Sequence, residues 1–162
     1  MLAGKDFTSM ITQEQFKVLL PLATAWAEEQ EGVILRDGIP LNKLQMTDAQ
    51  ILGINQPEKV RLLNVAVIPL PDDPLLEAAA QSIQLITPRT IGLTLRYGIF
   101  VRSDCWGDRG LIVHELVHTS QYERLGGFVP FLQQYLYECN TIGYPAAPME
   151  QEAITTTARL VG

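Results

Sequence analysis

The sequence has 162 residues, a length that fits one domain with a single hydrophobic core. Hydrophobic residues make up 47% of it and charged residues 19%, which excludes a disordered chain and favours a packed globular one. The 18 acidic and 12 basic residues give a net charge of -6, and the basic residues are scattered singly, so nucleic-acid binding is not expected.

Targeting and redox features are sparse. Residues 1–10 lack a positive segment followed by an apolar run, so no signal peptide is predicted. Apolar stretches are too short to cross a bilayer, and Pro69 and Pro71 interrupt one of them. Cys105 and Cys139 are too few for a disulfide framework and are expected to be buried free thiols. We expect a cytoplasmic protein without a membrane span, with export by a route that needs no cleaved signal as the alternative.

The first predicted helix runs from Thr12 to Gly32. Thr12 and Gln15 have the spacing of a capping box, and apolar residues follow at helical spacing. Pro21 is expected to kink this helix. A helical turn is then expected over residues 47–52, and a strand over residues 59–70, where β-branched residues alternate.

The second half of the chain begins with another helix start. Asp73 followed by proline predicts a helix that runs to Ile86. Residues 90–102 alternate between apolar and other residues and predict strand, with Gly98 marking a bulge or a bend between two strands. The residues expected on one apolar face are Ile91, Leu93, Leu95, Tyr97, Ile99 and Val101. Three further helices are expected over residues 108–126, 128–138 and 148–160.

This order of elements, with strands before a run of helices, predicts an α+β domain. No internal repeat or flexible linker divides the chain, so residues 1–162 are expected to form one domain. Within it, residues 1–90 form an N-terminal portion of helices and strands, and residues 91–162 contain the candidate functional motifs.

An HExxH motif lies in the helix predicted over residues 108–126, formed by His114, Glu115 and His118. Residues four apart on a helix are separated by about 400°, so the two histidines project from one face, one turn apart. Two imidazole nitrogens so placed can bind one zinc ion at about 2.0–2.1 Å. Glu115 lies about 100° from His114, beside the metal, where it can act as a general base on zinc-bound water.

The motif is specific in this chain, because its two histidines are the only ones in the sequence. A random arrangement of the same residues would produce the pattern in roughly one sequence in a thousand. The alternative is an amphipathic helix whose histidines are satisfied by hydrogen bonds. Burying two imidazoles and a carboxylate without a metal would leave polar groups unpaired, so the motif predicts a zinc site.

The third ligand must come from outside the motif. A metzincin would continue as HExxHxxGxxH, but Gln121 and Arg124 occupy the later positions. With no histidine left, a carboxylate is the natural ligand. Glu123 lies five residues after His118, about 140° from the ligand direction, and is expected to be a solvated surface residue.

Three glutamates remain as candidates for this third ligand. Glu138 follows His118 by 20 residues, a separation seen in thermolysin-like enzymes, but it lacks their Asn-Glu-x-x-Ser-Asp pattern. Glu150 and Glu152 lie on the first turn of the last predicted helix, behind Pro148. The residues alone leave all three open.

The segment 91–153 resembles the zinc-binding core of small bacterial gluzincin-like metallopeptidase domains. The likeness rests on the strand pair through residues 98–101, the helix over residues 111–118 with Gln121, and the Pro-Met-Glu-Gln-Glu-Ala run at residues 148–153. It implies a zincin-like α+β domain, in which a small antiparallel or mixed sheet packs against the HExxH helix and a C-terminal glutamate helix. The resemblance covers roughly the C-terminal 40% of the chain.

The same resemblance implies roles for particular residues. The third ligand would be Glu150, the first glutamate of the Glu-x-Glu-Ala run, ahead of Glu152 and then Glu138. Ala153 would let the glutamate helix approach the HExxH helix closely. The strand over residues 99–102 would be the edge along which a peptide substrate lies.

Gluzincins usually add a tyrosine or histidine that donates a hydrogen bond to the tetrahedral oxyanion. Because 12 residues follow Glu150, no such donor is expected downstream at the usual distance. Tyr144 is the expected substitute, with Tyr137 and Tyr122 as alternatives, although a tyrosine is more commonly a packing residue.

Together these features predict a zinc-dependent hydrolase, specifically a metallopeptidase that acts on a peptide or protein. Zinc would be held by His114, His118 and Glu150, and Glu115 would activate the attacking water. The competing hypothesis is a catalytically inactive zinc-binding module, such as an accessory or toxin-associated domain that keeps the fold and the metal.

Overall fold

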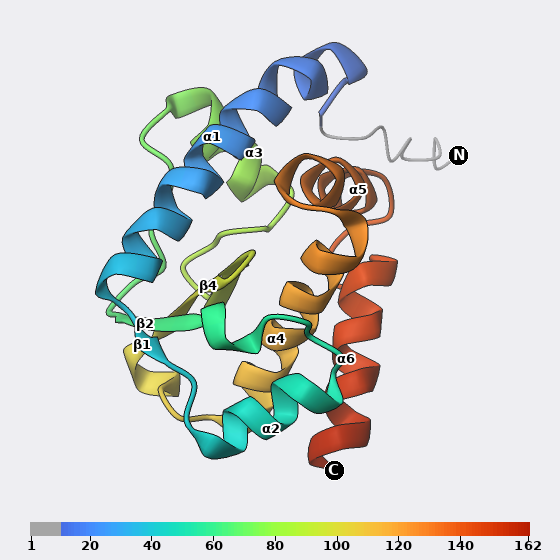
Figure 1. Cartoon of the computed structure of the whole chain (residues 1–162). Coiled ribbons are helices and arrows are strands. Elements are labelled where there is room, and N and C mark those ends of the chain that lie inside the picture. Colours follow the sequence, from blue (N-terminus) through green and yellow to red (C-terminus); the bar gives the residue numbers. More distant parts are fainter. Residues whose placement is uncertain (1–10) are drawn as a thin grey trace.

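Residues 11–162 are described by the computed structural model, so the signal-peptide prediction for residues 1–10 lies outside the described part. The strands are β1 (Ile39–Pro40), β2 (Arg61–Val65), β3 (Gly92–Leu95) and β4 (Gly98–Arg102). The α-helices are α1 (Gln13–Asp37), α2 (Lys43–Ile51), α3 (Pro74–Ser82), α4 (Arg109–Leu125), α5 (Phe128–Thr141) and α6 (Pro148–Val161), with short 3-10 helices at Pro57–Lys59 and Ser103–Cys105. The described chain is therefore a mixed α+β structure, as expected (Figure 1).

The helix starts follow the capping residues of the sequence. Thr12 Oγ1 accepts from the backbone N–H of Gln15 at 3.1 Å, and the Gln15 side chain accepts from Thr12 N–H at 2.9 Å, which confirms the predicted capping box. Asp108 caps α4 by accepting from Leu111 N–H at 2.8 Å. That helix ends at Gly126, whose φ of 102° lies in the left-handed region.

Several predicted boundaries are wrong. Helix α1 does not end at Gly32 but continues to Asp37, because Ile34 in its last turns is fully buried against the sheet. Strand β2 covers Arg61–Val65 and not the predicted residues 59–70, and Val67, beyond its end, is exposed. Helix α3 ends at Ser82, short of residue 86, whereas α2 and α5 are longer than predicted.

The strands over residues 92–102 form a hairpin whose turn reverses the predicted faces. Leu93 pairs opposite Phe100, and Leu95 opposite Gly98. A turn at Arg96, where φ is 60°, separates the strands, so Ile99 lies on the opposite face from Leu93. The prediction of one apolar face was wrong because a turn resets the alternation of a strand.

The sheet has the order β1-β2-β4-β3, with β2 and β4 parallel and the other pairs antiparallel. Strand β4 is therefore internal and cannot be the edge along which a substrate lies, so that expectation was wrong. The open edge beside the HExxH helix belongs to β3. Since β2 comes from residues 1–90 and β4 from residues 91–162, the two portions of the sequence share one sheet.

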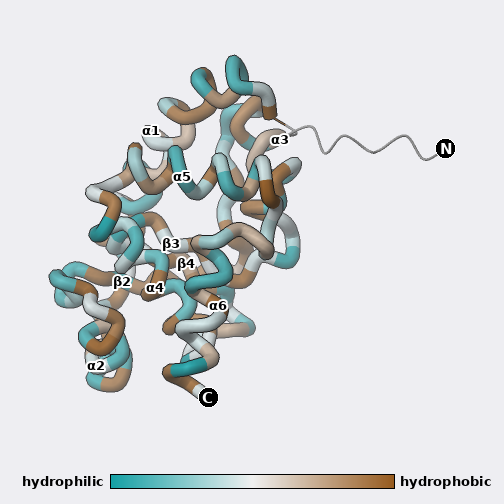
Figure 2. Tube along the Cα trace, turned by 90° about the vertical axis from the view of Figure 1, so that its right-hand side faces the viewer, coloured by the Kyte–Doolittle hydropathy of each residue, from teal (hydrophilic) through white to brown (hydrophobic). Residues whose placement is uncertain are grey.

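Helices cover both faces of the sheet. Helices α1, α3 and α5 pack with Leu95 and Phe100 on one face, and α2 and α4 pack with Leu62, Ile99 and Val101 on the other. Figures 1 and 2 show α1, α3 and α5 gathered at one end of the molecule and α2 at the opposite end. The alternation of polar and apolar residues along α1 and α5 in Figure 2 matches their packing on one side only.

Two further predictions concern the cysteines and membrane-spanning helices. Both cysteines are free, and Cys139 is buried as expected, but Cys105 is partly exposed because it lies in the short helix that follows β4. Among residues 11–162, no helix is long and apolar enough to cross a membrane.

Candidate metal centre

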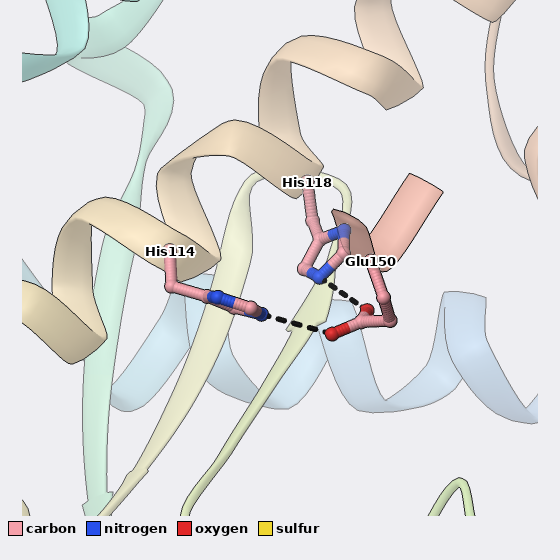
Figure 3. Close-up of side chains that lie close together, drawn as sticks. All are labelled: His114, His118 and Glu150. Atoms are coloured by element: carbon pink, nitrogen blue, oxygen red, sulfur yellow. Dashed lines mark hydrogen bonds and ion pairs between the residues drawn. The ribbon is translucent and has the colours of Figure 1, made fainter. Parts of the chain in front are cut away.

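Three side chains that the sequence suggested as zinc ligands converge between α4 and α6 (Figure 3). His114 Nε2 lies 3.0 Å from Glu150 Oε1, and His118 Nε2 lies 2.8 Å from Glu150 Oε2. The candidate ligand atoms all lie within 4.8 Å of one another. His118 and Glu150 are buried, and His114 is partly accessible. The arrangement brings two imidazoles from one helix onto a single carboxylate from another.

Gln121 determines which nitrogen of His118 faces Glu150. Its Nε2 donates to the Met149 carbonyl at 2.9 Å, so its Oε1 is the atom 2.8 Å from His118 Nδ1. Since Oε1 can only accept, His118 Nδ1 must carry a proton and donate. The Nε2 of a neutral His118 then presents a lone pair toward Glu150, the orientation typical of a metal-binding histidine with an outer hydrogen-bond partner.

A lone pair and a carboxylate oxygen repel each other unless a proton or a cation lies between them. Burial alone would lower the pKa of His118, but the hydrogen bond and negative charge of Glu150 outweigh burial and raise it to about 9. Burial would raise the pKa of Glu150, but hydrogen bonds from His114 and His118 lower it far below its usual range. The site therefore favours a positive charge between these atoms, which a proton or a metal ion could supply.

The donor set also fits a metal by its chemistry. Tetrahedral ligands at 2.0–2.1 Å from a zinc ion lie about 3.4 Å apart. The two histidines lie 3.0 and 2.8 Å from different oxygens of Glu150, and the three candidate ligand atoms lie within 4.8 Å of one another, so side-chain rotations would be needed to place all three around one ion. Two imidazoles and one carboxylate are a donor set that suits zinc and also non-haem iron(II).

Contacts at the start of α6 explain why Glu150 reaches this position. Glu138 Oε1 accepts from Met149 N–H at 2.8 Å, so Glu138 serves as a capping carboxylate for α6 and does not join the cluster. Ala153, one turn after Glu150, is fully buried where α6 packs on α4. A small residue at this position allows the close approach that the sequence resemblance implied.

The other candidate glutamates have different partners. Glu152 forms an ion pair with Arg124 at 2.9 Å on the surface, away from the histidines. Glu123 accepts from the backbone N–H groups of Asn55 and Gln56 and from the Tyr97 hydroxyl, so it anchors a loop. The expectation of a solvated surface residue was wrong for Glu123, because this loop folds back onto the far end of α4.

Tyr135 is a member of the site that the sequence did not suggest. Its hydroxyl donates to Glu150 Oε2 at 2.8 Å, and its ring lies edge-on to His118. Burial, together with the charge of Glu150, holds the pKa of Tyr135 well above its usual range, so the hydroxyl stays protonated. In the sequence, Tyr135 is one residue of an apolar helical stripe, and only its position after a polar Gln-Gln pair distinguishes it.

Glu115 lies beside the cluster on the side of the sheet edge. Its Oε2 accepts from Thr94 Oγ1 at 2.5 Å, and the same hydroxyl lies 3.0 Å from the Glu115 carbonyl oxygen. A Cβ at Gly92 would lie 2.8 Å from Glu115 Oε1, so the carboxylate occupies space that only a glycine leaves free. The carboxylate is buried and held between β3 and the histidines.

The three candidate tyrosines differ in their exposure and in their position relative to the cavity beside the cluster. Tyr144 lines the same cavity as His114, Glu115 and His118, and burial with the nearby charge of Glu150 raises its pKa to about 12. Tyr137 is 61% exposed and does not line that cavity. Tyr122 is buried and donates a long, 3.4 Å hydrogen bond to the Thr94 carbonyl. Tyr122 and Tyr144 both line the cavity and both have raised pKa values, but Tyr122 is 1% exposed and Tyr144 is 42% exposed, so Tyr144 is the more accessible hydroxyl.

The cluster opens into a cavity of about 1140 Å³. Strand β3, the connection over residues 83–91 and helices α1, α3, α4, α5 and α6 contribute residues that line this space. A site beside such a cavity is accessible to a molecule larger than water.

Comparisons of the chain with protein-family models, curated proteins and solved structures gave no match. The chemistry of the site therefore carries the functional argument by itself.

Proposed function

We propose that this chain is a zinc-dependent hydrolase, a metallopeptidase with a zincin-like arrangement of sheet, HExxH helix and glutamate helix. The observation that carries the proposal is the convergence of His114, His118 and Glu150, with Gln121 orienting His118. Two histidines and one glutamate form the ligand set of catalytic zinc sites, in which the fourth position is left to water or substrate. A structural zinc site would supply a fourth protein ligand, and the cluster within residues 11–162 has three.

Zinc held by these three residues would act as a Lewis acid and lower the pKa of water toward about 7. Glu115 is the group that accepts a proton from the attacking water and returns it to the leaving amine. Its carboxylate is positioned by Thr94 and by the space at Gly92. Tyr144, which keeps its proton, is the candidate donor to the developing oxyanion.

The open edge of β3 supports a peptide substrate. Arg102 N–H donates to the Ile91 carbonyl, so the antiparallel alternation turns the Leu93 backbone toward β4 and the Gly92 and Thr94 backbone toward the open edge. The Thr94 carbonyl there accepts one long hydrogen bond from Tyr122 and keeps a second lone pair. An extended peptide added there would form backbone hydrogen bonds. It would pass directly beside Glu115, which contacts both edge residues.

Metal analysis combined with a protease assay tests the proposal. The purified chain is expected to retain one zinc ion per chain after dialysis and to cleave an unfolded protein such as casein, with activity lost on chelation and restored by zinc. A chain that retains no zinc would overturn the proposal. Retention of zinc without hydrolysis of any peptide or amide would instead support the inactive zinc-binding module.

The Thr94 hydroxyl is expected to position Glu115. Thr94→Val should lower kcat roughly 10-fold, because it removes one hydrogen bond to a charged group, and should leave zinc affinity unchanged. Steady-state kinetics and zinc titration of the same preparations measure the two effects. Thr47→Val, an exposed change on α2, is the matched control. Equal loss of zinc affinity and rate in Thr94→Val would show that the hydroxyl does not act through Glu115.

Zinc affinity is expected to rise with pH, since zinc must displace the proton that His118 and Glu150 share. The pKa of His118 without metal is about 9, so below that pH each binding event releases a proton. The association constant should increase about tenfold per pH unit between roughly pH 6 and pH 8. Titration in competition with a chelator, repeated in buffers of different ionisation enthalpy, measures both affinity and proton release. An affinity independent of pH over this range would contradict the arrangement.

A further inference from the structure

The cavity beside the metal centre extends well beyond the space that a single scissile bond requires. Its volume of about 1140 Å³ exceeds the roughly 300–1,000 Å³ of pockets that enclose small ligands. His114, Glu115, His118 and Glu150 supply its buried or half-buried charged and imidazole groups. Polar side chains away from them, among which are Gln81, Gln84 and Arg89, are exposed to solvent. From the metal centre the cavity runs between α1, α3 and α5.

The walls formed by α1, α3 and α5 present mainly apolar side chains and few hydrogen-bonding groups. Helix α1 contributes only apolar side chains, among them Leu19, Ala23 and Trp26. Helix α5 contributes Leu132 and Leu136, with a single hydroxyl at Tyr135 that is already engaged with Glu150. The backbone groups of α1, α3 and α5 are paired within the helices. The connection over residues 83–91 also lines the cavity, and there the backbone N–H groups of residues 83–87, 89 and 90 already donate hydrogen bonds within the chain.

This composition distinguishes between two kinds of occupant. A peptide extended along the cavity would place several backbone amides against helical walls, and each unpaired amide would lose its hydrogen bonds to water. Beyond the edge of β3, no strand in the cavity lining can pair with it. A hydrocarbon chain has no such groups and gains from every methylene it buries.

We propose that the substrate is an amide whose acyl side is a long hydrocarbon chain, as in a long-chain N-acyl peptide, and that the cavity holds this chain. The inference rests on the proposed hydrolase function and adds its substrate class. The amide carbonyl would lie at the polar end, beside Glu115. Water oxygen bonds to the acyl carbon, the C–N bond breaks, and the amine leaves with the proton carried by Glu115, giving a carboxylate and an amine.

The test compares dodecanoyl-glycine amide with acetyl-glycine amide, using the zinc-loaded full chain. Each methylene buried contributes a factor of about four, so the dodecanoyl substrate is expected to have a kcat/KM at least about 100-fold higher. Independently of turnover, dodecanoate is expected to bind at least about 100-fold more tightly than acetate, with the negative heat-capacity change of apolar burial.

Variants of α3 locate the binding site of the chain. Ala80→Phe fills the cavity from a buried position, and Ala79→Phe does so from a half-buried one that tolerates a larger side chain. Either variant that keeps a cooperative thermal transition should lose at least about 10-fold in dodecanoate affinity. Ala78→Phe, exposed on the same helix and outside the cavity lining, is the matched control and should bind dodecanoate as the wild type does.

The outcomes separate this inference from the proposed function. Equal kcat/KM for the two amides, or dodecanoate affinity no greater than that of acetate, would overturn the acyl-chain inference while hydrolysis itself stands. Binding of dodecanoate that folded Ala79→Phe or Ala80→Phe leaves unchanged would also overturn it. Tight dodecanoate binding that these variants weaken, in a chain that hydrolyses no amide, would support the cavity's role as a site for the chain and overturn the hydrolase.

Discussion

Replacement of Glu115 by glutamine is expected to lower kcat by about 10²–10⁴-fold, the contribution of a positioned general base. Glutamine keeps the shape of the side chain and can still accept from Thr94 Oγ1, but its amide cannot take a proton from water. Because Glu115 lies outside the ligand cluster, zinc affinity should change little. Steady-state kinetics and zinc content measured on one preparation separate these two effects.

The matched control for this experiment is Glu29→Gln, which removes the same charge from an exposed position on α1. It should leave both rate and zinc content at wild-type levels. A Glu115→Gln variant that hydrolyses substrate at the wild-type rate would exclude Glu115 as the base. Loss of zinc in this variant would instead indicate that the carboxylate contributes to metal binding.

Replacement of Glu150 by glutamine is expected to weaken zinc binding by at least about 100-fold. Removing even an outer-sphere partner of a metal ligand commonly costs about 10–100-fold, and Glu150 supplies the only carboxylate in the cluster. Glutamine retains an oxygen that can accept from Tyr135, so the fold should tolerate it better than alanine. Competition titration with a chelator measures the affinity, and the thermal transition of the metal-free protein checks folding.

Glu152→Gln is the corresponding control, since Glu152 lies on the same turn of α6 and pairs with Arg124 at the surface. Its zinc affinity should equal that of the wild type. If Glu152→Gln or Glu138→Gln loses zinc while Glu150→Gln retains it, the third ligand is misassigned. Glu138→Gln is expected to reduce stability, because Glu138 caps the N-terminus of α6 through Met149 N–H.

The sequence predicted both ends of α4, the helix that carries the histidines. Asp108 and Gly126 mark its ends, and the spacing of His114 and His118 places both on one face. These features depend on contacts within a few residues, so helical periodicity alone predicts them. The side of the helix on which Glu115 lies follows from the same geometry.

Other features required the packed structure. The sequence left Glu150, Glu152 and Glu138 as competing ligands, and the packing of α6 on α4 decides which of them reaches the histidines. Tyr135 joins the site through contacts between α5 and α6, which no local pattern predicts. The pairing of β4 with β2, a strand about 35 residues earlier in the chain, likewise leaves β3 as the edge of the sheet.

Backbone geometry sets the relative directions of residues within one helix, so local periodicity was enough to predict the helix, the shared face of His114 and His118, and the position of Glu115 beside them. Three features could be seen only in the packed molecule: Glu150 faces the histidines, β3 is the open edge of the sheet, and an apolar cavity adjoins the site. Each of these depends on how separate elements pack. That packing depends on the burial of apolar surface from segments far apart in the sequence, and local periodicity does not predict it.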